Sequence, residues 1–105
     1  SGKYRNGNMP ENSRLKLFSN LARFSNDKCF KATDLYYDIA VKYDLSLTQM
    51  SLAFVNDRPF VTSNIIGATS MDQLKENINS INLKLSKEII AEINLVNEKI
   101  PNPAP

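Results

Sequence analysis

The most informative segment of the chain reads Ile65-Ile66-Gly67-Ala68-Thr69-Ser70-Met71-Asp72-Gln73-Leu74-Lys75-Glu76-Asn77. The β-branched run that enters it predicts one short buried strand over 60–67, closed by Gly67. Ser70 and Gln73 have the spacing of a capping box, which predicts a helix that begins there. A glycine between a strand and a helix start leaves unpaired backbone N–H groups at the positive end of the helix dipole, where an anion is favoured.

Polar side chains surround this predicted helix start. Thr69 and Ser70 supply hydroxyl groups, and Gln73, Glu76 and Asn77 follow at spacings of three and four, so they share one face of the helix. The set suits a phosphate together with a hydrogen-bonded group such as a nucleobase. Taken alone, the pattern also describes an ordinary helix in which Ser70 is only an N-cap and Asn77 is solvated, and this plainer interpretation is the more frequent one.

The rest of the chain is predicted to be mainly α-helical. Apolar residues recur at helical spacing from Asp27, and further helix starts are expected at Ser46, Ser70 and Ser86. In the third helix Leu74, Ile78 and Ile81 are expected to face inward. The predicted organisation is a loop over 1–26, helices within 27–56, a strand over 60–67, helices within 70–100 and an extended proline-rich tail over 101–105. A lone strand cannot pair its own backbone groups, so it requires a second copy or strands outside this chain.

Composition excludes several classes of site. The 105 residues include no His and one Cys, which excludes His-based nucleophile systems, disulfides within the chain and multi-Cys or His metal sites. We expect no metal site. The formal net charge is +2, but residues 1–31 carry seven basic and two acidic side chains, so a basic arm precedes a mildly acidic body.

Hydropathy predicts neither a membrane span nor a signal peptide. Apolar runs such as Ala53–Val55 are a few residues long, whereas a bilayer requires about 20, and no apolar h-region follows the N-terminus. The single Cys fits a reducing compartment, so we expect a cytoplasmic location. The chain begins with Ser-Gly-Lys, not Met, which suggests a processed or truncated piece.

The 65–77 segment resembles the adenosine-phosphate site of the aldo/keto reductases, whose motif is Gly-x-Thr/Ser-x-x-x-Gln-Leu-x-Glu-Asn. Here Gly67, Thr69, Gln73-Leu74 and Glu76-Asn77 match it in order and without gaps. The opening Ser1-Gly2-Lys3-Tyr4 is similar to an element that follows the seventh barrel strand in that family. Phe18–Ser25 and the tail 101–105 are similar to a bacterial branch of the family.

This resemblance implies the C-terminal part of an α/β (β/α)8 TIM barrel, with residues 1–26 as a cofactor-covering loop and 60–67 as the last strand. The implied cofactor is NADP. Lys3 and Arg14 would hold its pyrophosphate and 2′-phosphate, and Glu76 and Asn77 would bond the adenine. The implied cofactor-binding residues are Lys3, Arg14, Gly67, Ala68, Thr69, Ser70, Gln73, Glu76 and Asn77.

The resemblance also implies what this chain does not carry. Members of the family reduce carbonyl groups with an Asp, Tyr, Lys and His set on earlier strands, and none of the four tyrosines here matches the catalytic one. We therefore expect an NADP-dependent oxidoreductase acting on aldehydes or ketones only as a whole protein, and no catalytic residue or activity in the chain alone. A fragment of this kind is expected to expose apolar faces and to self-associate.

The alternative is an independent helical protein-interaction module that contacts an acidic partner through its basic arm. Such a module would fold cooperatively as a monomer. Binding to nucleic acid is not expected, because aromatic residues are not regularly interleaved with the basic ones.

Overall fold

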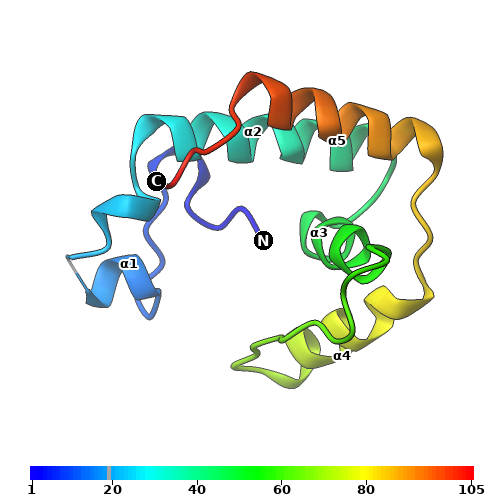
Figure 1. The fold of residues 1–105 in the computed structure, drawn as a ribbon. Helices are drawn as coiled ribbons and strands as arrows, with labels where there is room; N and C mark the ends of the chain where they lie inside the picture. The colour runs from blue at the N-terminus through cyan, green and yellow to red at the C-terminus, as the bar shows by residue number, and fades with distance from the viewer. Residues whose placement is uncertain (19) are drawn as a thin grey trace.

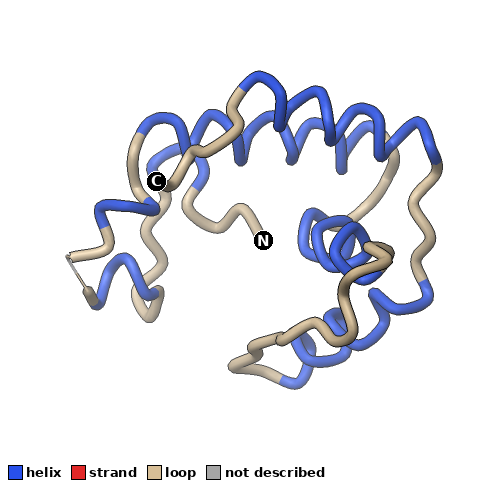
Figure 2. The backbone as a smooth tube through the Cα atoms, in the orientation of Figure 1, coloured by secondary structure: helices blue, strands red, loops and turns tan. Residues whose placement is uncertain are grey.

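Helices are the only regular elements in the part of the chain that the structure, a computed structural model, describes: residues 1–18 and 20–105 (Figures 1 and 2). The α-helices are α1 (Arg14–Leu17), α2 (Asp27–Lys42), α3 (Leu47–Asn56), α4 (Met71–Asn79) and α5 (Lys87–Lys99). Single 3-10 turns lie at η1 (Arg5–Gly7), η2 (Ala22–Phe24) and η3 (Ser80–Asn82). Ser19, part of the Phe18–Ser25 similarity, lies outside the described residues. None of these helices is long and apolar enough to cross a bilayer.

Side-chain caps start the four longer helices. The N-caps Asn26, Ser46, Ser70 and Ser86 each accept a hydrogen bond from the backbone N–H three residues further on. Each such bond satisfies one of the donors that a helix start leaves unpaired, and it contributes about 1 kcal/mol. The helix starts expected at Ser46, Ser70 and Ser86 are therefore confirmed.

Helix α2 ends in a left-handed turn. Asp44 adopts a φ of 54°, and the next backbone N–H, that of Leu45, donates to the carbonyl of Ala40 at 2.8 Å. Together with the bond from the Asp44 N–H to the Val41 carbonyl, this is a Schellman motif with Asp in the usual glycine position. The turn sets the direction in which the chain enters α3.

The core lies where three helices meet. Helices α2 and α5 run side by side in opposite directions, and α3 packs against α2 and α4 (Figure 1). Met50 is the most deeply buried large side chain, at 2% exposure. The buried core cluster consists of Ile39, Ala40, Met50, Ile89, Ile93 and Val96.

The molecule is more open than a compact domain of its length. The α2–α5 pair forms the top of an arch, from which α3 and α4 extend at one end and α1 at the other (Figure 2). The radius of gyration is 14.2 Å, against about 13 Å for a compact chain of about 100 residues. Exposed large apolar side chains are found in most segments: Met9, Leu17, Phe18, Phe24, Val41, Val55, Phe60, Ile65, Ile66, Met71, Ile78, Ile81 and Leu95.

Two expectations about residues 60–81 are not met in this structure. The segment 60–67 is not a strand, and Phe60 and Ile65 are 82% and 95% exposed instead of buried. Ile78 and Ile81, expected to face inward, are also exposed. The cause is the same in both cases: the described residues offer no second strand to pair with the segment and no layer to cover that side of α4.

Candidate functional site

The N-terminal end of α4 is an exposed turn built by Thr69, Ser70 and Gln73. The Ser70 hydroxyl accepts from the backbone N–H of Gln73 at 3.2 Å. The Gln73 side-chain oxygen accepts from both the backbone N–H and the hydroxyl of Thr69, at 2.9 and 3.0 Å. Gln73 thus reaches back one residue further than a regular capping box would place it. It fixes the turn, and the Thr69 hydroxyl proton is engaged within the chain.

Asn77 connects this turn to the body of α4. Its side chain is only 8% exposed, and its Nδ2 donates to the backbone carbonyl of Gly67 at 3.0 Å. The alternative in which Asn77 is a solvated surface residue is therefore wrong. A buried amide that holds the carbonyl of Gly67 fixes the path of the chain in front of the helix start.

Gly67 leaves room for a close approach to the backbone. A Cβ atom added at this position would meet nothing within 4 Å. The turn is exposed, and the free N–H groups at the start of α4 carry partial positive charge. The residue types and the open space therefore fit a phosphate group placed next to Gly67 and the start of α4.

Glu76 lies one turn further along α4 and is held from another helix. Its Oε1 accepts a hydrogen bond from the hydroxyl of Ser46, the N-cap of α3. The amino group of Ser1 interacts electrostatically with the Glu76 carboxylate. Burial lowers the pKa of that amino group, and the carboxylate acts in the opposite direction. The start of the chain and Glu76 thus share one region of the molecule.

The two basic residues expected at the same site differ in where they lie. Arg14 is exposed on α1, which Figure 1 shows at the other arm of the arch from α4. Lys3 is exposed, with its Nζ 5.3 Å from the centre of the Tyr4 ring. The structure therefore brings together Gly67, Ala68, Thr69, Ser70, Gln73, Glu76 and Asn77, and it leaves Arg14 apart from them.

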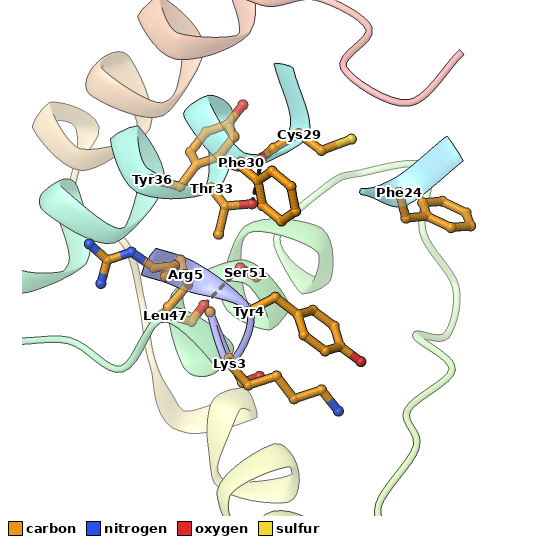
Figure 3. A pocket seen from close by; sticks show the side chains of 12 residues that line it. Lys3, Tyr4, Arg5, Phe24, Cys29, Phe30, Thr33, Tyr36, Leu47 and Ser51 are labelled. Carbon is orange, nitrogen blue, oxygen red and sulfur yellow. Dashed lines mark hydrogen bonds between the residues drawn. The ribbon is translucent and has the colours of Figure 1, made fainter. Parts of the chain in front are cut away.

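A pocket of about 350 Å³ lies between the N-terminal segment and α2 (Figure 3). Lys3 and Tyr4 line one side, and Phe30, Thr33 and Tyr36 come from α2 on the other. The backbone N–H of Leu15 donates to the Tyr4 hydroxyl at 3.2 Å, which lowers the pKa of Tyr4 and ties the N-terminal segment to α1.

Arg5 is a basic residue with specific contacts that the sequence did not indicate. Its Nε lies 2.6 Å from Oδ1 of Asp34, and its guanidinium lies 3.6 Å from the centre of the Tyr37 ring. The hydrogen bond to Asp34 raises the pKa of Arg5. One charge of the basic arm is thus matched by α2. The sequence offers no signal for this pair, because 29 residues separate its members.

The described residues contain no cluster of three or more His, Cys, Asp or Glu side chains that could hold a metal ion. The α4 site is suited to recognition by hydrogen bonds and by the helix dipole. The turn at 67–70 offers donors to an anion, and the Glu76 carboxylate offers an acceptor a turn away.

Comparison with known proteins identifies related sequences. The sequence model of the aldo/keto reductase family matches residues 1–98. The chain is 48% identical to the protein tas of Escherichia coli K12 over 105 residues, which is 100% of the chain and 30% of that protein. This similarity confirms the bacterial branch indicated by the sequence.

More distant relatives have other names. A probable voltage-gated potassium channel subunit beta of rice is 33% identical over 106 residues, covering 96% of the chain and 32% of that protein. An L-glyceraldehyde 3-phosphate reductase of E. coli O157:H7 is 33% identical over 99 residues, covering 89% of the chain and 28% of that protein. The chain thus spans about 30% of the length of the curated relatives it matches.

Proposed function

The chain belongs to the aldo/keto reductase family, and we propose that it is the cofactor-binding part of an NADP-dependent oxidoreductase that reduces aldehydes or ketones. Family membership supports an oxidoreductase, and a relative named as a reductase of an aldehyde, L-glyceraldehyde 3-phosphate, supports the carbonyl substrate. When bound, NADPH supplies the hydride. The residues of this chain bind and orient the cofactor.

One observation carries the proposal: the family motif and the built turn coincide. The residues that match the motif are those that the structure gathers at the start of α4, where Gly67 faces open space and Asn77 fixes its carbonyl. In the proposal Gly67, Ala68, Thr69, Ser70 and Gln73 line the 2′-phosphate, and Glu76 and Asn77 lie against the adenine. One N–H of the Asn77 amide already holds the carbonyl of Gly67, so the rest of that amide is what would face the adenine.

Lys3 and Arg14 complete the proposed site from the covering loop, residues 1–26. As charge-assisted donors they would hold the pyrophosphate and the 2′-phosphate. Because Arg14 lies on the opposite arm of the arch from α4, this part of the proposal requires the loop to fold across the bound nucleotide. Arg14 is exposed and makes no ion pair within the described residues, so such a movement breaks no salt bridge of its own.

The proposed parent fold is the TIM barrel of the family, with this chain as its C-terminal part. In the barrel the segment 60–67 would pair with a neighbouring strand and bury Phe60 and Ile65. The exposed apolar side chains of the isolated chain then predict self-association, whereas the alternative, a helical interaction module with a basic arm, predicts a monomer. Sedimentation velocity at several concentrations distinguishes the two. A cytoplasmic location stays a prediction.

Titration with NADP⁺ and NAD⁺ tests the function. It is applied to the 105-residue chain and to a hybrid in which the chain replaces the matching segment of E. coli tas. We expect tighter binding of NADP⁺, and equal or absent binding in both proteins contradicts the proposal. Arg14→Gln is expected to weaken NADP⁺ about tenfold with little effect on NAD⁺. The matched control is Lys16→Gln, a basic residue of the same helix that pairs with Glu11 at 3.6 Å.

Activity is expected only in the hybrid. The catalytic Asp, Tyr, Lys and His set implied by the family lies outside this chain, so NADPH oxidation in the presence of an aldehyde should be absent for the isolated chain. Turnover by the isolated chain would refute this part of the proposal.

A further inference from the structure

Ser46 has two hydrogen-bonding partners, and they belong to different helices. Its hydroxyl oxygen accepts from the backbone N–H of Gln49 at 3.3 Å, which caps α3. Its hydroxyl proton is donated to Oε1 of Glu76 on α4, 30 residues away in the sequence. A hydroxyl can do both at once, because it carries one proton and two lone pairs. The N-cap of α3 is therefore also a partner of the Glu76 carboxylate.

Gln49 reinforces this connection from the same turn of α3. Its side-chain Nε2 lies 3.4 Å from the backbone carbonyl of Glu76, to which it donates. Helices α3 and α4 pack directly against each other, and Asn77 is buried next to this contact. Both the side chain and the backbone of Glu76 are thus held by α3, whereas the other residues of the α4 site are held by the turn before that helix.

We propose that Ser46 is a positioning residue that orients the Glu76 carboxylate and thereby sets the preference of the site for adenine over hypoxanthine. This inference rests on the proposed function, in which Glu76 lies against the base. A carboxylate only accepts hydrogen bonds, so on adenine it pairs with the exocyclic amino group at position 6. Hypoxanthine carries a carbonyl oxygen at that position, which repels a carboxylate.

The geometry explains why a second residue is required. Glu76 is half-buried at the surface, and an unrestrained Glu side chain samples many rotamers, which costs binding free energy when one is selected. With Oε1 held by Ser46, the carboxylate samples fewer orientations. Loss of the Ser46 hydroxyl should therefore reduce the base preference without removing the carboxylate.

The experiment measures the ratio of the dissociation constants of NADP⁺ and of its hypoxanthine analogue by calorimetry, for the chain and for the tas hybrid. Glu76→Gln is expected to lower the preference for adenine about tenfold, because an amide pairs with either base. Ser46→Ala should lower it about threefold or more, and Ser46→Thr, which keeps a hydroxyl cap, should retain it.

Two further variants separate positioning from helix stability. Ser86→Ala removes the equivalent cap of α5, where the Ser86 hydroxyl accepts from Ile89 at 3.3 Å, and it should leave the base preference unchanged. Ser46→Asp keeps an acceptor at the N-cap but sets a second carboxylate against Glu76, so it should lower the preference while circular dichroism shows that the helices remain. This variant keeps the test decisive if Ser46→Ala does not fold.

The outcomes distinguish failure of the positioning role of Ser46 from failure of the proposed NADP-binding function. If Glu76→Gln lowers the preference but Ser46→Ala and Ser46→Asp do not, the positioning role is wrong and the proposed function stands. If Glu76→Gln has no effect on the preference, the base-binding role of Glu76 and the inference both fail. If neither protein binds NADP⁺, the proposed function fails as well.

Discussion

Asn26 and Pro103, 77 residues apart in the sequence, are joined by a hydrogen bond of 2.9 Å from the Asn26 Nδ2 to the Pro103 carbonyl. The same side chain caps α2, because its Oδ1 accepts from the backbone N–H of Cys29 at 3.1 Å. The Cys29 thiol lies 3.1 Å from the Pro103 carbonyl, to which it donates, and Arg23 Nε donates to Ala104 at 2.8 Å. Asn26 thus caps α2 and, together with Cys29 and Arg23, links its start to the C-terminal tail.

Two substitutions of Asn26 separate these contacts. Asn26→Asp keeps an N-cap acceptor but loses the donor to Pro103, whereas Asn26→Ala loses both and should cost about 1 kcal/mol more in the free energy of unfolding. Both variants should release the tail from Cys29, so the rate of Cys29 alkylation by iodoacetamide should rise in both. Asn26→Asp with the wild-type alkylation rate would show that the tail is held without this bond.

Gly67 and Gly2 should respond in opposite ways to alanine. Gly67→Ala meets no atom within 4 Å, so it should leave the chain as stable or stabilise it by about 0.4–1 kcal/mol, while the added methyl weakens nucleotide binding. Gly2 has a φ of +70°, and its added Cβ would lie 3.1 Å from Cδ of Arg5. Gly2→Ala should therefore cost about 1–2 kcal/mol. Urea unfolding and NADP⁺ titration measure the two effects, and unchanged NADP⁺ affinity in Gly67→Ala would exclude close approach at this glycine.

Ile65 distinguishes the isolated chain from a complete barrel. The side chain is 95% exposed, so Ile65→Ser should change the stability of the isolated chain little and should reduce its self-association. In the tas hybrid, where we propose that 60–67 is a buried strand, the same change should cost about 2–5 kcal/mol. Met50→Ala, in the core at 2% exposure, should be costly in both proteins. A harmless Ile65→Ser in the hybrid contradicts the strand.

The ion pair between α2 and α5 should make stability depend on pH. Lys42 Nζ lies 2.8 Å from Glu92 Oε1, and this contact lowers the pKa of Glu92 and raises that of Lys42. Because the folded-state pKa of Glu92 is depressed, its contribution is present above the ordinary carboxyl pKa and is lost as pH falls through the folded value. The contribution of Lys42 is present below its ordinary pKa and is lost as pH rises through its folded value.

Glu92→Gln should therefore reduce the loss of unfolding free energy that the chain shows as the pH falls. Its largest effect on stability is expected near neutral pH, where the wild-type pair is charged. The pair is partly exposed, so the effect should be small and should shrink with added salt. Urea unfolding between acid and neutral pH measures it, and Glu98→Gln, an exposed residue of the same helix, is the control. Equal pH dependence in wild type and Glu92→Gln would show that the pair is not formed in solution.

Local sequence predicted the helix starts well, and the strand that it predicts is not formed in this chain. Ser46, Ser70 and Ser86 cap as expected because a cap depends only on residues within one turn. The β-branched run at 60–67 predicts a strand, but a strand is stable only with a partner, and the described residues supply none. The spacing of Ile78 and Ile81 likewise predicts a buried helix face. That face is exposed here, because the described residues supply no layer to cover it.

The sequence by itself therefore determined the helix starts, the basic arm and the family motif, since each is written in residues close together along the chain. The tertiary structure alone decided that Gln73 reaches back to Thr69, that Asn77 is buried against Gly67, and that Ser46 holds Glu76. It also matched Arg5 with Asp34 and left Arg14 apart from α4. Such pairings depend on how the turns between helices direct the chain, and local propensity does not specify which distant groups then meet.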